Sequence, residues 1–193
     1  MSPNHPPISR FSIRQWTSAT LCALCLFASY SVLAQAPPAE TRALLPVAQL
    51  SGSAKLKVWG FEVYNAALWV EPGFRPDSYA EHEFCLELSY LRDFTNEDIA
   101  NRSIEEMRRM GEFSSAQAQR WQKLLQASYP DVKKGDRIVG VNQPGKGMVF
   151  FTNGLKTGEI TDPELTRLFF GIWLAPTTSE PRLRQALLAR TRS

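Results

Sequence analysis

The sequence predicts a single α+β domain in which helices cover one face of an antiparallel β-sheet. Three observations carry this prediction. Segments typical of strands and helices follow one another in the order three strands, two helices, three strands, two helices. Short turns separate the last three strands, and such turns join antiparallel neighbours. The chain of 193 residues is 44% hydrophobic and 11% aromatic, which suffices for one core and leaves little room for a second domain.

The N-terminus has the pattern of a secretory signal peptide over residues 1–34. Arg10 and Arg14 give a positively charged start, and residues 17–34 carry no charge. Small residues precede Gln35, where a cut is expected, or two residues later. The alternative is an uncleaved anchor, because 18 uncharged residues can just span a bilayer. We predict cleavage, and hence a periplasmic or secreted protein with no other membrane span.

Cleavage changes the charge and the cysteine count. It leaves 159 residues in which 20 Lys and Arg face 19 Asp and Glu, so the net charge falls from +3 to +1. A nearly neutral chain does not have the basic surface of a nucleic-acid-binding protein. Cys22 and Cys25 leave with the signal, and the remaining thiol, Cys85, has no internal partner for a disulfide. We expect Cys85 to occupy a buried strand position.

The first half of the domain, which we bound at residues 44–190, reads as strands. Residues 35–43 are a polar, Pro-rich segment expected to be a loose leader. Residues 44–70 are strand-like, with clear alternation of polar and apolar side chains at 55–59. Gly60 interrupts them and predicts a bulge or a tight corner. Residues 83–91 are the next strand.

The pattern changes to helical spacing over residues 95–129. Thr95 and Asp98 form the pair expected of a capping box, and Gly111 ends the first helix. Ser114 or Ser115 begins a second helix. This stretch therefore predicts a helical hairpin.

Three short strands and two helices complete the domain. The strands are predicted at 137–141, 148–152 and 155–160, and Asn153-Gly154 is a strong signal for the hairpin between the last two. Asp162 followed by Pro begins a helix at its first positions. A last helix is expected over residues 179–189.

Several kinds of chemistry find no support in the sequence. Beyond the signal there is one histidine, His82, and no nucleophile is placed beside it by any motif. Cysteines and histidines have no metal-site spacing, and no phosphate-binding loop opens a helix. We therefore predict neither a metal nor a cofactor.

The aromatic content favours a cleft for an apolar ligand between sheet and helices, although most of these rings are expected in the core. A few basic and hydroxyl groups could orient such a ligand. The candidates for ligand binding are Lys55, Lys57, Tyr64, Tyr90 and Arg92, with Arg102 as a further one on the helical hairpin. Lys55 and Tyr64 are also the weak candidates for catalysis.

Four segments have an order and spacing that point to a known family. They are residues 52–69 (GSAKLKVWGFEVYNAALW), 90–93 (YLRD), 134–136 (KGD) and 170–176 (FGIWLAP). Together they resemble the exported bacterial branch of the chalcone isomerase-like family, and the resemblance extends over residues 44–190. It implies the open-faced β-sandwich of the chalcone isomerase type, which agrees with the order of elements above.

The resemblance does not carry over the family's catalytic residues. Plant chalcone isomerases close a flavanone ring, using a strand arginine at the phenolate and a threonine, a tyrosine and an asparagine around the ketone. These positions fall at Lys55 or, with less support, Lys57, and near Tyr64, Ile99 and Glu106. A lysine lacks the planar fork of arginine, and an isoleucine donates no hydrogen bond. The catalytic set is therefore largely not reproduced.

Three functions follow as hypotheses. The first is an exported domain that binds a small apolar or fatty-acid-like ligand without conventional chalcone isomerase catalysis, as the fatty-acid-binding branch of the fold implies. Lys55 or Arg92 would then pair with the ligand carboxylate, and Tyr64 would form a hydrogen bond to it. The second is an intramolecular lyase or isomerase acting on a chalcone-like enone. The third is an envelope protein-interaction module. The oligomeric state is open.

Overall fold

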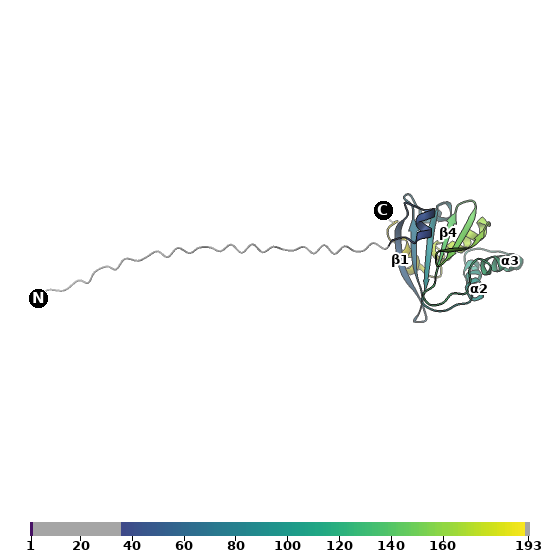
Figure 1. Cartoon of the computed structure of the whole chain (residues 1–193), viewed down its shortest axis with the longest axis horizontal. Coiled ribbons are helices and arrows are strands. Elements are labelled where there is room, and N and C mark those ends of the chain that lie inside the picture. Colours follow the sequence, from purple (N-terminus) through teal and green to yellow (C-terminus); the bar gives the residue numbers. More distant parts are fainter. Residues whose placement is uncertain (2–35, 192–193) are drawn as a thin grey trace. The chain divides into compact units, whose positions relative to one another are not determined.

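A six-stranded antiparallel sheet forms the centre of the domain (Figure 1). The computed structural model describes Met1 and residues 36–191, so the predicted signal peptide falls outside the described residues except for Met1. Each strand pairs with its neighbours in sequence, in the order β1 to β6. The strands are β1 (Gln49–Val58), β2 (Phe61–Val70), β3 (Phe84–Tyr90), β4 (Arg137–Gln143), β5 (Gly147–Thr152) and β6 (Leu155–Ile160).

The predicted strand region at residues 44–70 is a hairpin of two strands. Trp59 and Gly60 connect β1 to β2, and both have positive φ, at 50° and 83°. Lys55 pairs with Asn65 and Leu56 with Tyr64 across the hairpin, with irregular register between Leu56 and the next residue. The tight corner expected at Gly60 is thus a reversal of the chain.

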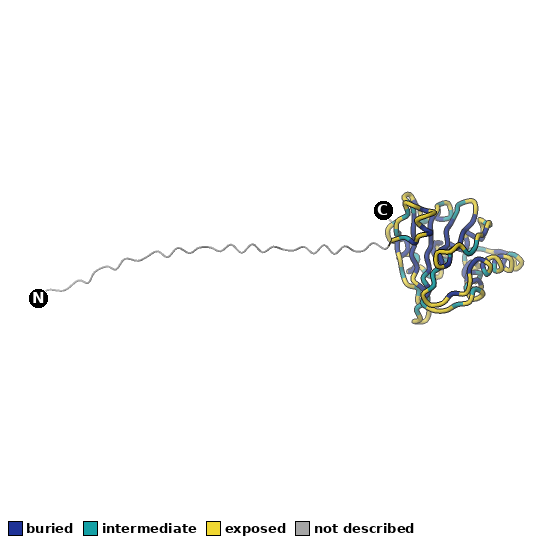
Figure 2. The backbone as a smooth tube through the Cα atoms, in the orientation of Figure 1, coloured by how far each residue is buried: buried dark blue, intermediate teal, exposed yellow. Residues whose placement is uncertain are grey.

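The helices lie mostly on one face of the sheet, as predicted. Capping boxes at Thr95 and Ser114 begin α2 and α3, and the Asp162 side chain caps α4. The helices are α1 (Ala39–Leu44), α2 (Asn96–Arg108), α3 (Ser115–Gln126), α4 (Pro163–Leu174) and α5 (Pro181–Leu187), with a 3₁₀ helix η1 (Pro76–Glu81). The buried segments in Figure 2 follow the strands and the inner sides of the helices, and the turns are exposed.

The prediction that residues 35–43 form a loose leader is wrong for the second half of this segment. Residues 39–44 form α1, which lies against the opposite face of the sheet from the other helices. Glu40 is buried there and pairs with Arg137 on β4 at 2.8 Å. Leu45, directly after α1, packs with Trp69 and Cys85 in a second, smaller apolar cluster. The polar composition of this segment concealed a single buried charge that pairs with the sheet.

Cys85 occupies the buried strand position that the sequence predicts. Its side chain is inaccessible to solvent, and burial raises the pKa of the thiol to about 12. The thiol therefore stays protonated at neutral pH and is a poor nucleophile.

The helical hairpin is held away from part of the sheet. α2 packs against α3 and α4, while α4 packs against β5 and α5 against β1. Space therefore remains between α2 and the helix-facing side of β2 and β3. No helix within the described part of the chain is long and apolar enough to cross a membrane.

Candidate functional site

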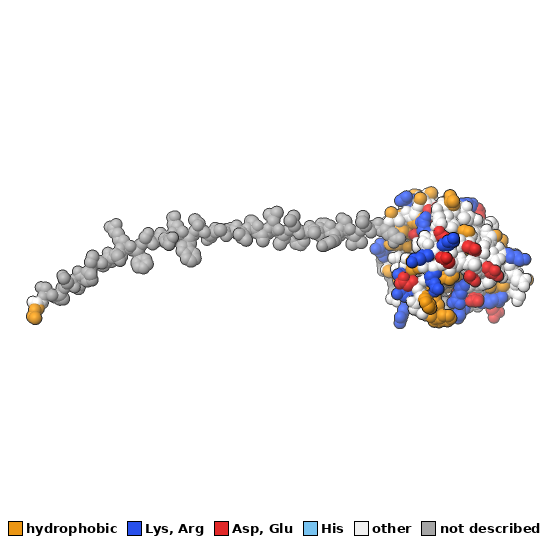
Figure 3. Space-filling view, turned by 60° about the horizontal axis from the view of Figure 1, so that its bottom comes forward, with side chains coloured by type: hydrophobic (Ala, Val, Ile, Leu, Met, Phe, Trp, Pro, Cys, Tyr) orange, Lys and Arg blue, Asp and Glu red, His pale blue; other side chains and the backbone are white. Residues whose placement is uncertain are grey.

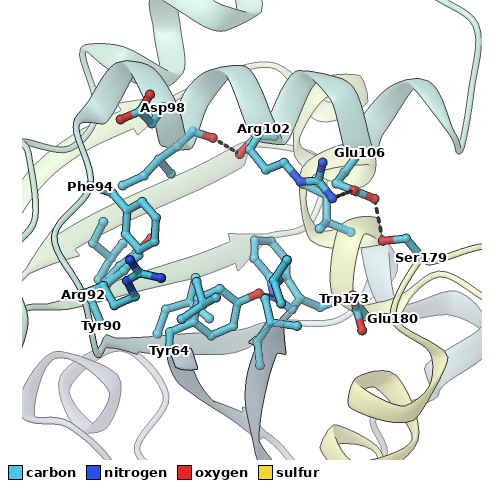
Figure 4. Close-up of a pocket in the computed structure, with 18 of the residues that line it drawn as sticks. Tyr64, Tyr90, Arg92, Phe94, Asp98, Arg102, Glu106, Trp173, Ser179 and Glu180 are labelled. Atoms are coloured by element: carbon cyan, nitrogen blue, oxygen red, sulfur yellow. Dashed lines mark hydrogen bonds and ion pairs between the residues drawn. The ribbon is translucent and has the colours of Figure 1, made fainter. Parts of the chain in front are cut away.

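A cavity of about 540 Å³ lies in the space between α2, α4 and the sheet (Figure 4). Its walls are mostly apolar, and polar side chains are confined to a few places. The apolar lining includes Leu56, Leu88, Ile138, Phe150, Phe169 and Ile172. Pockets that bind small molecules have volumes of about 300–1,000 Å³ and this kind of lining.

Strand alternation decides which side chains reach the cavity. Leu56 and Tyr64 are paired across β1 and β2, and both line it. Lys55 is the neighbour of Leu56, so its side chain points to the other face of the sheet. There it pairs with Glu62 at 2.8 Å, and Lys57 pairs with the same carboxylate at 3.3 Å. These contacts, with Lys55 the stronger, lower the pKa of Glu62.

The expectation that Lys55 and Lys57 bind the ligand is therefore corrected, because neither lines the cavity. Alternation in the sequence shows that the two lysines share a face of the strand. It does not show which face the helices cover.

Tyr64 and Tyr90, in contrast, both line the cavity, which is consistent with the prediction that they bind a ligand. Trp173 on α4 donates a hydrogen bond from Nε1 to the Tyr64 hydroxyl at 2.9 Å, and the two tyrosine rings meet edge to face at 6.0 Å. Burial raises the pKa of both phenols above the ordinary value, so both remain neutral. They act as walls and as hydrogen-bonding groups, not as charges.

Arg92 stands at the mouth of the cavity, just beyond the end of β3. Its guanidinium lies 4.9 Å from the centre of the Phe61 ring, and the side chain points toward the cavity beside Phe94 (Figure 4). Among the described residues, no carboxylate lies within ion-pair distance of it. Arg92 is therefore a cation whose charge is available to a ligand.

Arg102, the further candidate, also lines the cavity, but its charge is already engaged. It contacts Glu106 on the next turn of α2 at 2.5 Å and Glu105 at 3.1 Å. Glu106 is buried, and it also pairs with Arg109 at 3.4 Å and accepts a hydrogen bond from Ser179 at 2.7 Å. This network fixes one wall of the cavity, and within it the charges of the arginines and the glutamates compensate each other (Figure 4).

Two hydroxyl groups in the wall were not singled out from the sequence. Tyr129, which follows α3, is 4% exposed, and its hydroxyl has no hydrogen-bond partner among the described residues. Ser103 on α2 donates to the Ile99 carbonyl oxygen at 2.8 Å. Burial raises the pKa of Tyr129, and Ser103 lowers it by a smaller amount. No motif marks Tyr129, because it reaches the cavity only through the packing of α3.

Of the positions taken from the family resemblance, some line the cavity and others lie outside it. Tyr64, Ile99 and Glu106 line the cavity, so the chain is folded as the resemblance implies. Lys55 lies outside it, and Arg92 supplies the free cation instead. The site thus combines an apolar chamber, neutral hydroxyl groups and the available positive charge of Arg92 at the mouth. The carboxylates of Asp98 and Glu180 also line the cavity.

Comparisons with known proteins agree with this architecture. The family model described as chalcone isomerase-like matches residues 42–189. A protein of Haemophilus influenzae, described only as uncharacterized, is 31% identical over 138 residues, which are 70% of this chain and 65% of that protein. The crystal structure of a fatty-acid binding protein of Arabidopsis thaliana superposes with a TM-score of 0.57 at 14% identity, over 74% of this chain and 87% of the other.

Proposed function

The chain belongs to the chalcone isomerase-like family, and from that premise we propose that it binds a fatty-acid-like ligand in the cavity. The ligand is a small apolar molecule with a carboxylate head. We also propose that the domain acts after export, in the periplasm or outside the cell. The match to a fatty-acid binding protein supports a ligand-binding role for this fold.

The observation that carries the proposal is a largely apolar chamber with one uncompensated cation at its mouth. The chamber takes the hydrocarbon part of the ligand, because each buried CH₂ group contributes about 0.8 kcal/mol. Arg92 takes the carboxylate, since its planar guanidinium can donate two parallel hydrogen bonds. Arg102 is a weaker partner, because Glu105 and Glu106 already engage it.

Arg92→Gln is expected to weaken dodecanoate binding about tenfold or more. A hydrogen bond to a charged group contributes about 1.5–3 kcal/mol, and the exposure of Arg92 places the effect near the lower end. Dodecanol has the same chain without the charge, so its affinity should stay within about twofold. Titration calorimetry measures both ligands on the same preparations.

Arg75→Gln is the matched control, because Arg75 is an exposed arginine that does not line the cavity. It should leave both affinities unchanged. In the parent chain, affinity should rise about fourfold for each CH₂ group added until the cavity is full. Equal dodecanoate affinity in the parent and Arg92→Gln would reject Arg92 as the head-group site. If no fatty acid binds while chalcones are cyclised, the isomerase hypothesis replaces the proposal.

Export has its own test in the N-terminus of the protein recovered from its source. Cleavage of the predicted signal gives a chain that begins at Gln35 or two residues later. Mass spectrometry of the intact protein from the periplasmic fraction reads this directly. A chain that begins at Met1 and sediments with membranes would show the uncleaved anchor instead.

A further inference from the structure

The turn between β1 and β2 exposes large apolar side chains at the mouth of the cavity. Trp59 is 94% exposed, Phe61 60% and Val58 37%, and all three also line the cavity. Single exposed apolar residues are common on protein surfaces. Three of them on one hairpin tip, around the opening of an apolar chamber, mark an interaction surface. We call these three residues the tip.

The backbone at the tip is also unfavourable for its residue. Trp59 has a φ of 50°, which is strained for a bulky side chain and favours Gly, Asn or Asp. The turn between β5 and β6 provides a comparison within the chain, because Asn153 there has the same φ and is followed, like Trp59, by a glycine. The chain thus uses the favourable residue at one turn and a strained, solvent-exposed tryptophan at the other. Folding gains nothing from this choice, so a function of the indole ring explains it better.

Positive charges surround the tip. Lys55 and Lys57 on β1 share the single carboxylate of Glu62, which leaves the hairpin with a net positive charge. Arg92 adds a further cation beside Phe61. Figure 3 brings the lower end of the domain forward, and hydrophobic side chains there lie among charged side chains, with Asp and Glu present beside Lys and Arg. Aromatic rings flanked by basic groups are suited to the headgroup region of a membrane with anionic lipids.

We propose that the tip docks on an anionic lipid surface and places the mouth of the cavity against it. The indole of Trp59 and the ring of Phe61 enter the headgroup region, while Lys57 and Arg92 contact lipid phosphates. An apolar ligand then passes between bilayer and cavity without crossing water. The docking stands by itself, and only the transfer of ligand rests on the proposed function.

A protein partner is the less favoured occupant of the tip. A stable protein interface needs about 800 Å² on each partner, and a hairpin tip with three apolar side chains is small for that. A lipid surface requires no matching shape. It accepts both the apolar rings and the cations next to them.

Quenching of tryptophan fluorescence by brominated lipids tests the docking at the tip itself. The assay uses the chain that begins at Gln35, as the predicted cleavage leaves it, so that Trp16 and the uncharged segment 17–34 do not contribute. Trp69, Trp121 and Trp173 are buried. Vesicles of equal parts brominated phosphatidylcholine and phosphatidylglycerol should quench the emission of Trp59. The affinity for vesicles, obtained from the quenching titration, should fall at least tenfold when the phosphatidylglycerol is omitted. Emission that the vesicles do not change overturns the proposal.

Trp59→Asn distinguishes a docking role from a structural one. It places Asn-Gly in the turn, which relieves the strained φ, so the melting temperature should rise by a few degrees. Binding to the vesicles, measured by co-sedimentation because this variant lacks the reporting indole, should nevertheless fall at least tenfold. A lower melting temperature would mean that Trp59 serves the fold. If Trp59→Asn instead dissociated dimers and left vesicle binding unchanged, the tip would bind a second copy of the chain.

Moving the indole provides the matched control. In Trp59→Asn/Val47→Trp the exposed tryptophan lies just before β1, ten or more residues from the tip and at the opposite end of that strand. The exposed fraction of Val47 is 57%, similar to the 60% of Phe61. Vesicles should not quench the tryptophan introduced at this position. Quenching there as strong as at Trp59 would mean unspecific adsorption, and would reject docking through the tip.

The transfer of ligand is measured separately. A fluorescent dodecanoate should leave vesicles for the parent chain at a rate that increases with vesicle concentration, as for transfer by contact. With Trp59→Asn the rate should be slower and independent of vesicle concentration. Docking without any dodecanoate binding would reject the proposed ligand and retain the lipid surface. Binding of dodecanoate without docking would do the reverse.

Discussion

Ile99→Trp is expected to abolish fatty-acid binding while the domain remains folded. Ile99 lies on the side of α2 that faces the cavity, and it is only half-buried. An indole at this position can extend into the chamber without displacing the buried core, so overpacking strain stays small. It then occupies the volume that the hydrocarbon chain needs. Dodecanoate affinity should fall at least about 100-fold, because several CH₂ groups at about 0.8 kcal/mol each lose their place.

Ile99→Leu keeps the volume of the side chain and is the matched control. Its dodecanoate affinity should stay close to that of the parent, and both variants should unfold at similar temperatures. Calorimetric titration and thermal unfolding give the two quantities. Unchanged dodecanoate affinity in Ile99→Trp would show that the ligand does not enter the space between α2 and the sheet. Ile99→Trp also differs from Arg92→Gln in its effect on dodecanol. Ile99→Trp should weaken the binding of dodecanol as strongly as that of dodecanoate.

The local elements were predictable because each depends on a few neighbouring residues. Asn153 followed by Gly specifies its turn by backbone preference alone, and Thr95 with Asp98 specifies the start of α2 by two reciprocal hydrogen bonds. Cys85 was placed correctly as a buried strand residue for the same reason. Such signals do not depend on what the rest of the chain does.

The site was less predictable because it depends on which face the helices choose. The alternation at residues 55–59 is equally consistent with the lysines or with Leu56 facing the cleft. Only the packing of α2 and α4 decides between them. Tyr129 is brought to the cavity by the turn after α3, and the network around Glu106 needs Ser179 from the far end of the chain. Contacts between distant segments leave no mark in local sequence patterns.

The helix α1 shows the same limit and leads to the prediction with the largest expected effect on stability. The side chain of Glu40 is 2% exposed, and that of Glu87 on β3 is 10% exposed. Arg137 serves both carboxylates, at 2.8 Å from Glu40 and 3.9 Å from Glu87, and Trp69 donates a further hydrogen bond to Glu87 at 3.0 Å. One guanidinium therefore compensates two buried negative charges.

Arg137→Gln is expected to lower the free energy of unfolding by about 3–5 kcal/mol, because it leaves buried carboxylates without a cation. Arg120→Gln removes an exposed ion pair with Asp162 at 3.4 Å and should cost less than about 1 kcal/mol. Urea unfolding measures both. The double variant Glu40→Gln/Arg137→Gln should recover most of the loss, since the charge left most deeply buried is then absent. If Arg137→Gln costs no more than Arg120→Gln, α1 is not held to the sheet by this pair, and Leu45 with its apolar contacts must do so instead.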